Sequence, residues 1–208
     1  MKTISIMVPT YNEEGNVIPL CNAVRKEFAE NLPEYDYEIL FIDNHSKDKT
    51  RNKLEELCMK DKKVKAIFNA RNFGQNNSPF YGILQTTGDC TISICADFQD
   101  PVDMIHKFVK EWENGCKIVC GIKTSSKEGR FMYGIRSLYY KMIKKFSDVE
   151  QIEQFTGFGL YDKEFIDILR KLDEPSPLMR GLVAELGYKR KFIEYEQPLR
   201  RSGKTHNN

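Results

Sequence analysis

The sequence predicts an α/β protein with a mostly parallel, doubly wound sheet flanked by helices. Short apolar runs of strand length alternate with segments of helical periodicity over the first 120 residues or so, and polar residues follow several of the runs directly. Continuous apolar runs are typical of strands buried on both faces, as in parallel sheets. Strict strand–helix alternation indicates parallel strands joined by right-handed crossovers.

The expected elements follow in order. Strands are predicted at Ile4–Val8, Glu38–Ile42, Val64–Phe68, Thr91–Cys95 and Lys117–Gly121. Between them, helices are predicted at Glu14–Glu30, Lys49–Lys60, Asn76–Thr86 and Pro101–Glu113. The alternation then stops, and Gly129–Phe146 carries apolar residues at helical spacing with cations on the remaining surface. This segment predicts a basic amphipathic helix, which either packs on the core or docks at an anionic membrane interface.

Composition restricts the protein class more than it restricts the partner. A chain of 208 residues with 40% hydrophobic residues is expected to form one domain over 1–208. The formal net charge of +2 selects no partner by itself, although the stretches Lys123–Lys145 and Lys189–Lys204 are locally basic. Six scattered cysteines without a CxxC motif are predicted to be buried thiols in a reducing compartment. Without a signal peptide or an apolar run of about 20 residues, the chain by itself is expected to be soluble and cytosolic.

Polar residues follow the first four predicted strands. In doubly wound sheets ligands bind beyond the carboxyl ends of the strands, so these residues predict a binding site at one edge. Helix capping explains any single one of them, but four at one edge go beyond capping. They are Pro9–Glu13, Asp43–Ser46, Asn69–Asn72 and Asp97–Asp100.

The last of these loops predicts a metal site. Mg²⁺ and Mn²⁺ prefer carboxylate and carbonyl oxygens, which makes Asp97 the leading ligand and Gln99 a second ligand. Asp100 stands immediately before Pro101, where it is expected to cap the following helix.

Five strings, in order, resemble glycosyltransferase family 2, and most of all its polyprenyl-phosphate branch of dolichol-phosphate mannose synthases and bactoprenol-phosphate glucosyltransferases. The resemblance covers almost the whole chain, and the agreement of the five strings is far more specific than any one of them. They are VPTYNEEGN (Val8–Asn16), EILFIDNHSKDKT (Glu38–Thr50), NARNFGQ (Asn69–Gln75), GDCTISICADFQDP (Gly88–Pro101) and EWENGCKIVCGIK (Glu111–Lys123).

The resemblance implies a GT-A type, Rossmann-like fold and an inverting transfer of a sugar from a UDP- or GDP-linked donor to a polyprenyl phosphate. It divides the chain into a nucleotide-sugar-binding half, 1–122, and an acceptor-binding half, 123–208, and it implies that transmembrane helices follow in a longer parent chain. A metal, Mg²⁺ or Mn²⁺, is implied at Asp97 and Gln99. The nucleotide-binding positions are Pro9, Thr10, Tyr11, Glu13, Asp43, Asn44, Arg71, Gly74, Cys95 and Ala96, with Gly74 expected where the backbone passes close to the ligand.

Two positions depart from the family pattern. Asn44 stands where the family usually has Asp, and its amide oxygen can still accept a hydrogen bond from a ring N–H of uracil or guanine. Cys95 stands where the family usually opens the metal loop with Asp, so a carboxylate contact to the ribose or metal is lost. Metal affinity is the property that this second departure affects most.

The acceptor is inferred from chemistry. A sugar hydroxyl needs a general base, whereas a phosphate monoester is already largely ionised at neutral pH and needs only cations to place it. Asp162, in the stretch where family members of the first kind carry a base, precedes a helical run and is expected to be its N-cap. The resemblance places the acceptor phosphate at Arg130, Arg136 and Ser137.

The late string from Arg200 to His206 resembles the family's loop that folds over the donor, which implies that Arg201 and Lys204 contact the diphosphate. The predicted reaction is direct displacement, with Asp97 and Arg136 as the catalytic residues. The predicted location is the cytoplasmic face of a membrane in cell-surface glycan synthesis; a homo-oligomer is left open and nucleic acid is not an expected partner. Two alternatives are a polysaccharide-building transferase with Asp162 or Glu153 as base, and a catalytically silent nucleotide-sugar-binding module.

Overall fold

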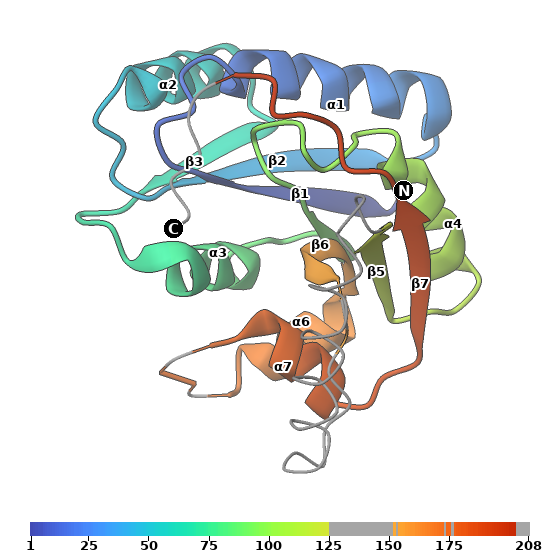
Figure 1. Cartoon of the computed structure of the whole chain (residues 1–208). Coiled ribbons are helices and arrows are strands. Elements are labelled where there is room, and N and C mark those ends of the chain that lie inside the picture. Colours follow the sequence, from blue (N-terminus) through green and yellow to red (C-terminus); the bar gives the residue numbers. More distant parts are fainter. Residues whose placement is uncertain (125–151, 153, 173, 176, 203–208) are drawn as a thin grey trace, which may run out of the picture.

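The computed structural model describes residues 1–202, apart from 125–151, 153, 173 and 176. Within these residues, helices on both faces cover one sheet (Figure 1). The strands are β1 (Thr3–Thr10), β2 (Asp36–Asp43), β3 (Val64–Phe68), β4 (Cys90–Ser93), β5 (Ile118–Lys123), β6 (Phe155–Asp162) and β7 (Arg190–Tyr195). The helices are α1 (Val17–Asn31), α2 (Thr50–Lys60), α3 (Gly74–Leu84), α4 (Met104–Glu113), α6 (Lys163–Leu169) and α7 (Met179–Glu185).

The strand order is β3-β2-β1-β4-β6-β5-β7. β1 pairs in parallel with both β2 and β4, β3 joins β2 in parallel, and β7 joins β5 in parallel. β6 runs antiparallel between β4 and β5. The predicted α/β class with a mostly parallel sheet is therefore confirmed, with β6 as the antiparallel exception.

The two faces of the sheet carry two separate cores. Ile4, Ile6 and Val8 of β1 belong to one core with side chains of α1, α2 and α4. Met7 of β1 points the opposite way and belongs to the other core, with side chains of α3, α6 and α7. Successive residues of β1 therefore bury their side chains on opposite faces, which is why its sequence is a continuous apolar run.

All the strands and helices predicted up to residue 123 are present, with ends shifted by a few residues. The largest shifts at a helix start are in α1, which begins at Val17 rather than Glu14, and in α4, which begins at Met104 rather than Pro101. The sequence did not predict β6, α7 or β7, and for α6 it predicted only a helical run after Asp162, without bounds. The predicted helix over Gly129–Phe146 lies outside the described residues. Whether 1–208 is a single domain stays a prediction.

The cysteines follow the expectation only in part. Cys21, Cys90, Cys116 and Cys120 are buried, but Cys58 is half-buried and Cys95 is exposed, so the prediction of buried thiols was wrong for these two. Among the described residues, every helix is too short or too polar to cross a membrane.

Gly159 in β6 lies against the backbone of β5, and a Cβ at this position would come within 2.4 Å of the Val119 carbonyl oxygen. We expect Gly159→Ala to lower the free energy of unfolding by about 1–3 kcal/mol, because the neighbouring atom belongs to a strand backbone that cannot move away. Urea denaturation followed by circular dichroism measures the change. Gly181→Ala in α7 is the control: nothing lies within 4 Å of its added Cβ, so it should be neutral or stabilising by up to about 1 kcal/mol. Equal losses in the two variants would contradict the prediction.

Candidate active site

The carboxyl ends of β1, β2 and β3 are joined by hydrogen bonds, so three of the predicted polar strand ends meet. The Asn44 N–H donates to the Thr10 carbonyl oxygen at 2.9 Å, and the Asn69 N–H donates to the Asp43 carbonyl oxygen at 2.9 Å. The Thr10 hydroxyl donates to the Ile42 carbonyl oxygen at 3.2 Å. The parallel register continues past the strands into the loops that follow them.

The side chain of Asn44 uses its full hydrogen-bonding capacity on the turn after β3. Its Oδ1 accepts from the Phe73 N–H at 2.8 Å and from Asn69 Nδ2 at 3.2 Å. Its Nδ2 donates to Asn72 Oδ1 at 2.9 Å and to the Gly74 carbonyl oxygen at 3.1 Å. The predicted acceptor for a nucleotide base is thus occupied, and Asn44 instead holds the 69–74 turn against the end of β2.

The backbone also fixes which way this amide points. Reversing it would set Nδ2 against the Phe73 N–H and Oδ1 against the Gly74 carbonyl oxygen, pairing donor with donor and acceptor with acceptor. An aspartate at position 44 has no donor for Gly74. The departure from the family's usual Asp therefore matches the local structure of this chain.

The loop after β2 is held by hydrogen bonds to the buried carboxylate of Asp43. This carboxylate accepts from the Ser46 N–H at 3.1 Å and from the Ser46 hydroxyl. Ser46 in turn accepts from the Asn12 N–H at 2.8 Å, which connects the loop to the segment after β1. Asn12 has a φ of 57°, a left-handed conformation that asparagine tolerates well.

The fourth strand end is joined to the first through Arg200. Its Nη1 lies 3.0 Å from Asp97 Oδ2, after β4, and its Nη2 pairs with Glu13 Oε1, after β1. Glu13 and Asp97 are only 8% and 7% exposed. Burial raises the pKa of the Glu13 carboxyl, while a hydrogen bond from Asn16 and the charge of Arg200 act in the opposite direction. One guanidinium thus bridges two buried carboxylates at the edge where the sequence predicted the site.

The segment carrying Arg200 lies across the start of α1, as the chain after β7 shows in Figure 1. Arg201 donates from Nη1 to the Gly15 carbonyl oxygen at 2.7 Å, and its N–H donates to the Asp97 carbonyl oxygen at 3.1 Å. The Ser202 carbonyl oxygen accepts from Asn16 Nδ2 at 3.2 Å. A Cβ on Gly15 would lie 2.8 Å from Ser202 Oγ, so the glycine permits this close approach.

Within the predicted metal loop, Asp97 Oδ1 accepts from the Gln99 N–H at 3.1 Å. Asp100 accepts from the Cys95 N–H at 2.9 Å and from the Tyr195 hydroxyl at 3.2 Å. The prediction that Asp100 caps the next helix was therefore wrong, because its carboxylate turns back into the loop and α4 begins only at Met104. Cys95 is exposed and Ala96 is buried beside Asp97.

The remaining nucleotide-site candidates lie at the same edge with different surroundings. Pro9 is in register with Ile42, and Tyr11 directly follows β1. Arg71 is exposed and its guanidinium stacks 4.1 Å from the centroid of Phe73.

Gly74 opens α3 with a φ of 86°, and a Cβ on it would meet no described atom within 4 Å. Its backbone conformation, and not a close approach by the rest of the protein, is what calls for glycine. The predicted Arg130, Arg136, Ser137, Lys204 and Glu153 lie outside the described residues.

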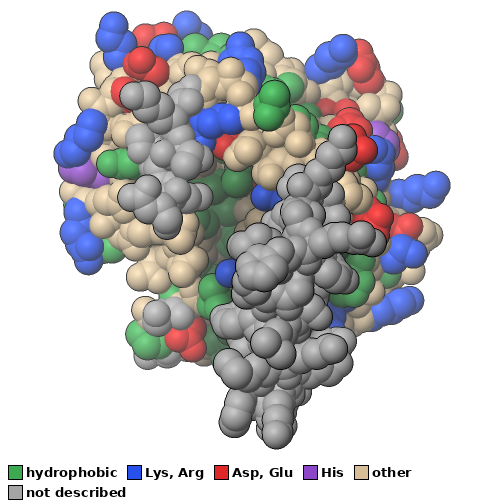
Figure 2. All heavy atoms as spheres, viewed as in Figure 1, with side chains coloured by type: hydrophobic (Ala, Val, Ile, Leu, Met, Phe, Trp, Pro, Cys, Tyr) green, Lys and Arg blue, Asp and Glu red, His purple; other side chains and the backbone are tan. Residues whose placement is uncertain are grey.

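The face of the molecule seen in Figure 2 carries charges of both signs. Figure 2 shows lysine and arginine side chains interspersed with acidic ones around the rim of this face. On the described part of this face, positive and negative side chains are therefore mixed rather than gathered into one broad positive patch.

The donor atoms available near Asp97 suit Mg²⁺ or Mn²⁺. No group of three or more His, Cys, Asp or Glu side chains that could hold a metal is found in the part of the chain that the structure describes. Mg²⁺ is commonly bound through one or two carboxylates together with substrate phosphates, so a protein-only cage is not required. Asp97 and Gln99 offer a carboxylate and an amide oxygen, which fits that mode of binding.

Asp162, the alternative base, belongs to a different part of the molecule. It pairs in register with Cys90 at the amino end of β4, so it lies at the opposite edge of the sheet from Asp97. As predicted, it caps a helix: its Oδ1 accepts from the Glu164 N–H at 2.9 Å.

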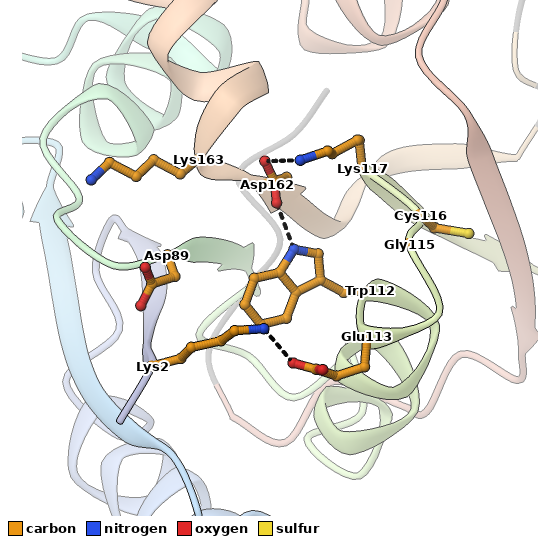
Figure 3. Close-up of a pocket in the computed structure, with 9 residues that line it drawn as sticks. All are labelled: Lys2, Asp89, Trp112, Glu113, Gly115, Cys116, Lys117, Asp162 and Lys163. Atoms are coloured by element: carbon orange, nitrogen blue, oxygen red, sulfur yellow. Dashed lines mark hydrogen bonds and ion pairs between the residues drawn. The ribbon is translucent and has the colours of Figure 1, made fainter.

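The other contacts of Asp162 are shown in Figure 3, where it lies between Trp112 and Lys117. Its Oδ2 accepts from Trp112 Nε1 at 2.7 Å, and Lys117 Nζ is 3.1 Å from Oδ1. Burial acts to raise the pKa of this carboxyl, but these hydrogen bonds hold it below its usual value. Both oxygens are engaged, which suits a structural role better than proton abstraction.

Arg200 is the site residue that sequence reasoning missed. Arg200 belongs to the string that resembles the closing loop, but the resemblance implied contacts to the diphosphate only for Arg201 and Lys204. Its partners are 187 and 103 positions away in the sequence, and no local pattern connects them. The available signal was the presence of two buried acids at adjacent strand ends, which requires a nearby cation.

Comparison with known proteins agrees with this geometry. The family model described as glycosyl transferase family 2 matches residues 5–169. Bactoprenol glucosyl transferase from Shigella phage SfX is 32% identical over 201 residues, which cover 96% of this chain and 65% of the relative. A prophage bactoprenol glucosyl transferase homolog from Escherichia coli (strain K12) is 32% identical over 203 residues, 97% of this chain and 66% of the relative. The chain thus spans slightly less than two thirds of the length of each.

Solved structures share the fold at low sequence identity. Glucosyl-3-phosphoglycerate synthase from Mycobacterium tuberculosis, in complex with Mn²⁺, UDP and phosphoglyceric acid, has a TM-score of 0.62 at 16% identity, covering 98% of this chain and 72% of that one. A mannosyltransferase from Pyrobaculum calidifontis, in complex with GDP-Man and Mn²⁺, has a TM-score of 0.62 at 15% identity. The match covers 95% of this chain and 58% of that one. The GT-A type of fold inferred from sequence is confirmed.

Replacing Asn44 tests its role in the turn. We expect Asn44→Asp to lower the free energy of unfolding by about 1–3 kcal/mol, because two hydrogen bonds are lost and a carboxylate faces the Gly74 carbonyl oxygen. Urea denaturation measures the loss. The matched control is Asn52→Asp at an exposed position of α2, which should change stability by less than about 0.5 kcal/mol. An unchanged midpoint in the Asn44 variant would contradict the assigned role.

Proposed function

The chain belongs to glycosyl transferase family 2, and from this premise we propose that it transfers a sugar from a UDP- or GDP-linked donor to a polyprenyl phosphate with inversion at the anomeric carbon. The observation that carries the proposal is the meeting of Glu13, Asp97 and Arg200 at the carboxyl edge of the sheet. Ligands of doubly wound sheets bind at this edge. The names of the bactoprenol glucosyl transferases support a lipid-phosphate acceptor.

The donor is proposed to lie over the ends of β1, β2 and β3. Thr10, Tyr11 and Asp43 are within this edge, and the exposed Arg71 at the 69–74 turn offers a cation to the nucleotide. Solved structures of the same fold carry UDP or GDP-Man, which supports a nucleotide-linked donor.

The departing diphosphate needs positive charge, because negative charge grows on it as the glycosidic bond breaks. We assign Asp97, with Gln99 beside it, to holding a divalent cation, which would supply electrostatic stabilisation of that charge. Arg200 and Arg201 lie at the same place and provide further cations from this chain. The Mn²⁺ in both of the solved structures described above supports the same assignment.

A phosphate acceptor accounts for the chemistry better than a hydroxyl acceptor. Asp162 lies at the far edge of the sheet with both oxygens engaged, so it is badly placed to take a proton from a sugar. An ionised phosphate oxygen attacks without a base. Arg130, Arg136 and Ser137 are proposed to place it, in the segment where this branch of the family binds its acceptor. A lipid acceptor implies work at a membrane surface, proposed here as its cytoplasmic face.

The acceptor class is tested directly. A panel of nucleotide-sugars is first screened for thermal stabilisation, since a ligand that binds the folded state raises Tm. The stabilising donor, radiolabelled, is then offered with polyprenyl phosphate or with an oligosaccharide. Label in the organic phase supports the proposal, and label in the oligosaccharide overturns it. Donor binding without any transfer or hydrolysis identifies a silent binding module and overturns it as well.

Asp97→Asn should reduce the rate of metal-dependent transfer roughly 100- to 1,000-fold, because a neutral amide holds a divalent cation poorly and the diphosphate then departs without compensation. Initial rates with saturating donor and acceptor measure the loss. The control is Asp103→Asn, at the residue just before α4. This exposed carboxylate pairs with Lys107 at 2.8 Å and lies outside the proposed site, so its variant should keep normal activity. Full activity in Asp97→Asn would remove the metal assignment.

A further inference from the structure

The three guanidinium nitrogens of Arg200, Nε, Nη1 and Nη2, each have a hydrogen-bond acceptor. Nη2 pairs with Glu13, Nη1 with Asp97 at 3.0 Å, and Nε donates to the Ser202 carbonyl oxygen at 2.8 Å. The side chain of Arg200 is 18% exposed, and those of Glu13 and Asp97 are 9% and 10% exposed. The planar fork of arginine is well suited to bridging two carboxylates in a fixed geometry.

The charges of this cluster do not balance. Two buried carboxylates face one guanidinium, and a buried carboxylate is costly unless a cation accompanies it. The carboxylate that the proposed function assigns to a divalent cation is Asp97, whose Oδ2 already faces Arg200 and whose Oδ1 accepts from Gln99. A divalent cation bound at Oδ2 would meet the positive charge of Arg200 at close range. The two cations therefore exclude one another from this carboxylate oxygen.

We propose that Arg200 and a divalent cation compete for Asp97, so that arrival of the metal releases Arg200 from this carboxylate. In the arrangement described here, Arg200 supplies the positive charge that the cation supplies in the loaded site. The inference rests on the proposed function, because it takes Asp97 as the metal-binding carboxylate. It adds a role for Arg200 that the function itself does not require. The guanidinium pairs with Asp97 while the cation is absent and leaves this carboxylate when the cation binds.

The rest of the segment stays attached when Arg200 leaves. Arg201 is bonded to the Gly15 carbonyl oxygen and to the Asp97 backbone oxygen, and Ser202 is bonded to Asn16. None of these contacts uses the carboxylate of Glu13 or Asp97. Release therefore turns one side chain rather than freeing the segment, and it leaves a guanidinium available beside the metal for a bound phosphate. By linkage, a phosphate that binds the released guanidinium would also tighten metal binding.

The competition is tested with Mn²⁺ alone, measured by calorimetry and by the loss of the free Mn²⁺ electron paramagnetic resonance signal. We expect Arg200→Gln to bind Mn²⁺ about tenfold or more tightly than the unaltered chain, within the usual range of coupling between sites. Arg200→Lys keeps the charge but cannot bridge both carboxylates in the same way, so its affinity should fall in between. This second variant also provides a folded protein if the glutamine variant unfolds, which thermal unfolding will reveal.

Two controls separate the charge at Asp97 from other effects. Arg201→Gln removes a cation from the same segment that touches neither carboxylate, and Lys191→Gln removes one from an exposed position of β7. Both should bind Mn²⁺ as the unaltered chain does. An equal gain in Arg201→Gln would show that loosening of the segment, and not competition by Arg200, limits metal binding, and would overturn the inference.

The outcomes also separate this inference from the proposed function. If Arg200→Gln binds Mn²⁺ no more tightly than the unaltered chain, while Asp97→Asn abolishes binding, the metal site stands and the competition is overturned. If Asp97→Asn leaves Mn²⁺ binding unchanged in the Arg200→Gln background, the metal does not use Asp97. The metal part of the proposed function and the competition then both fail. A gain in Arg200→Gln that Asp97→Asn removes supports both.

Discussion

The sheet must bury both of its faces, and this constraint determines where chemistry can take place. β1 is paired on both sides and packs against helices on both faces, so hardly any position within it can carry an exposed polar side chain. Polar side chains therefore lie at the carboxyl ends of β1, β2 and β4 and in the loops that follow. Because these strands are parallel, their carboxyl ends lie at one edge, and Thr10, Asp43 and Asp97 come together from distant parts of the sequence.

Three of the buried acids at this edge, Asp43, Glu13 and Asp97, are stabilised in two different ways. Asp43 accepts hydrogen bonds from the N–H and hydroxyl of Ser46, three residues away, so its carboxylate finds its hydrogen-bond donors within its own loop. Glu13 and Asp97 share the distant Arg200, which lies beyond β7. A carboxylate satisfied by its own loop favours a fixed structure. A carboxylate satisfied by a side chain from another segment can exchange that partner for a ligand, which is why the metal-binding role is proposed for Asp97 rather than for Asp43.

Sequence reasoning succeeded where the structure follows from local pattern. The continuous apolar runs of β1 to β5 and the helices between them predicted the sheet, and the polar strand ends predicted its edge. β6 was missed because Gly157 and Gly159 interrupt its pattern, although Gly159 is what allows β5 to approach. Arg200 was missed because its partners are distant in sequence. Asp100 was misassigned because a proline after an acid is typical of a helix start, and only the fold brings Tyr195 to it.

The two departures from the family pattern have different structural consequences. Asn44 is matched by its surroundings: Phe73 supplies a donor, Gly74 supplies an acceptor, and only an amide satisfies both. At position 95 the backbone N–H of Cys95 anchors Asp100, and this bond is open to any side chain except proline. The loop therefore keeps its shape and loses only a carboxylate. In the proposed function, a cation with fewer protein ligands would depend more on the phosphates of the donor, and the proposed competition from Arg200 against the metal alone would be correspondingly stronger.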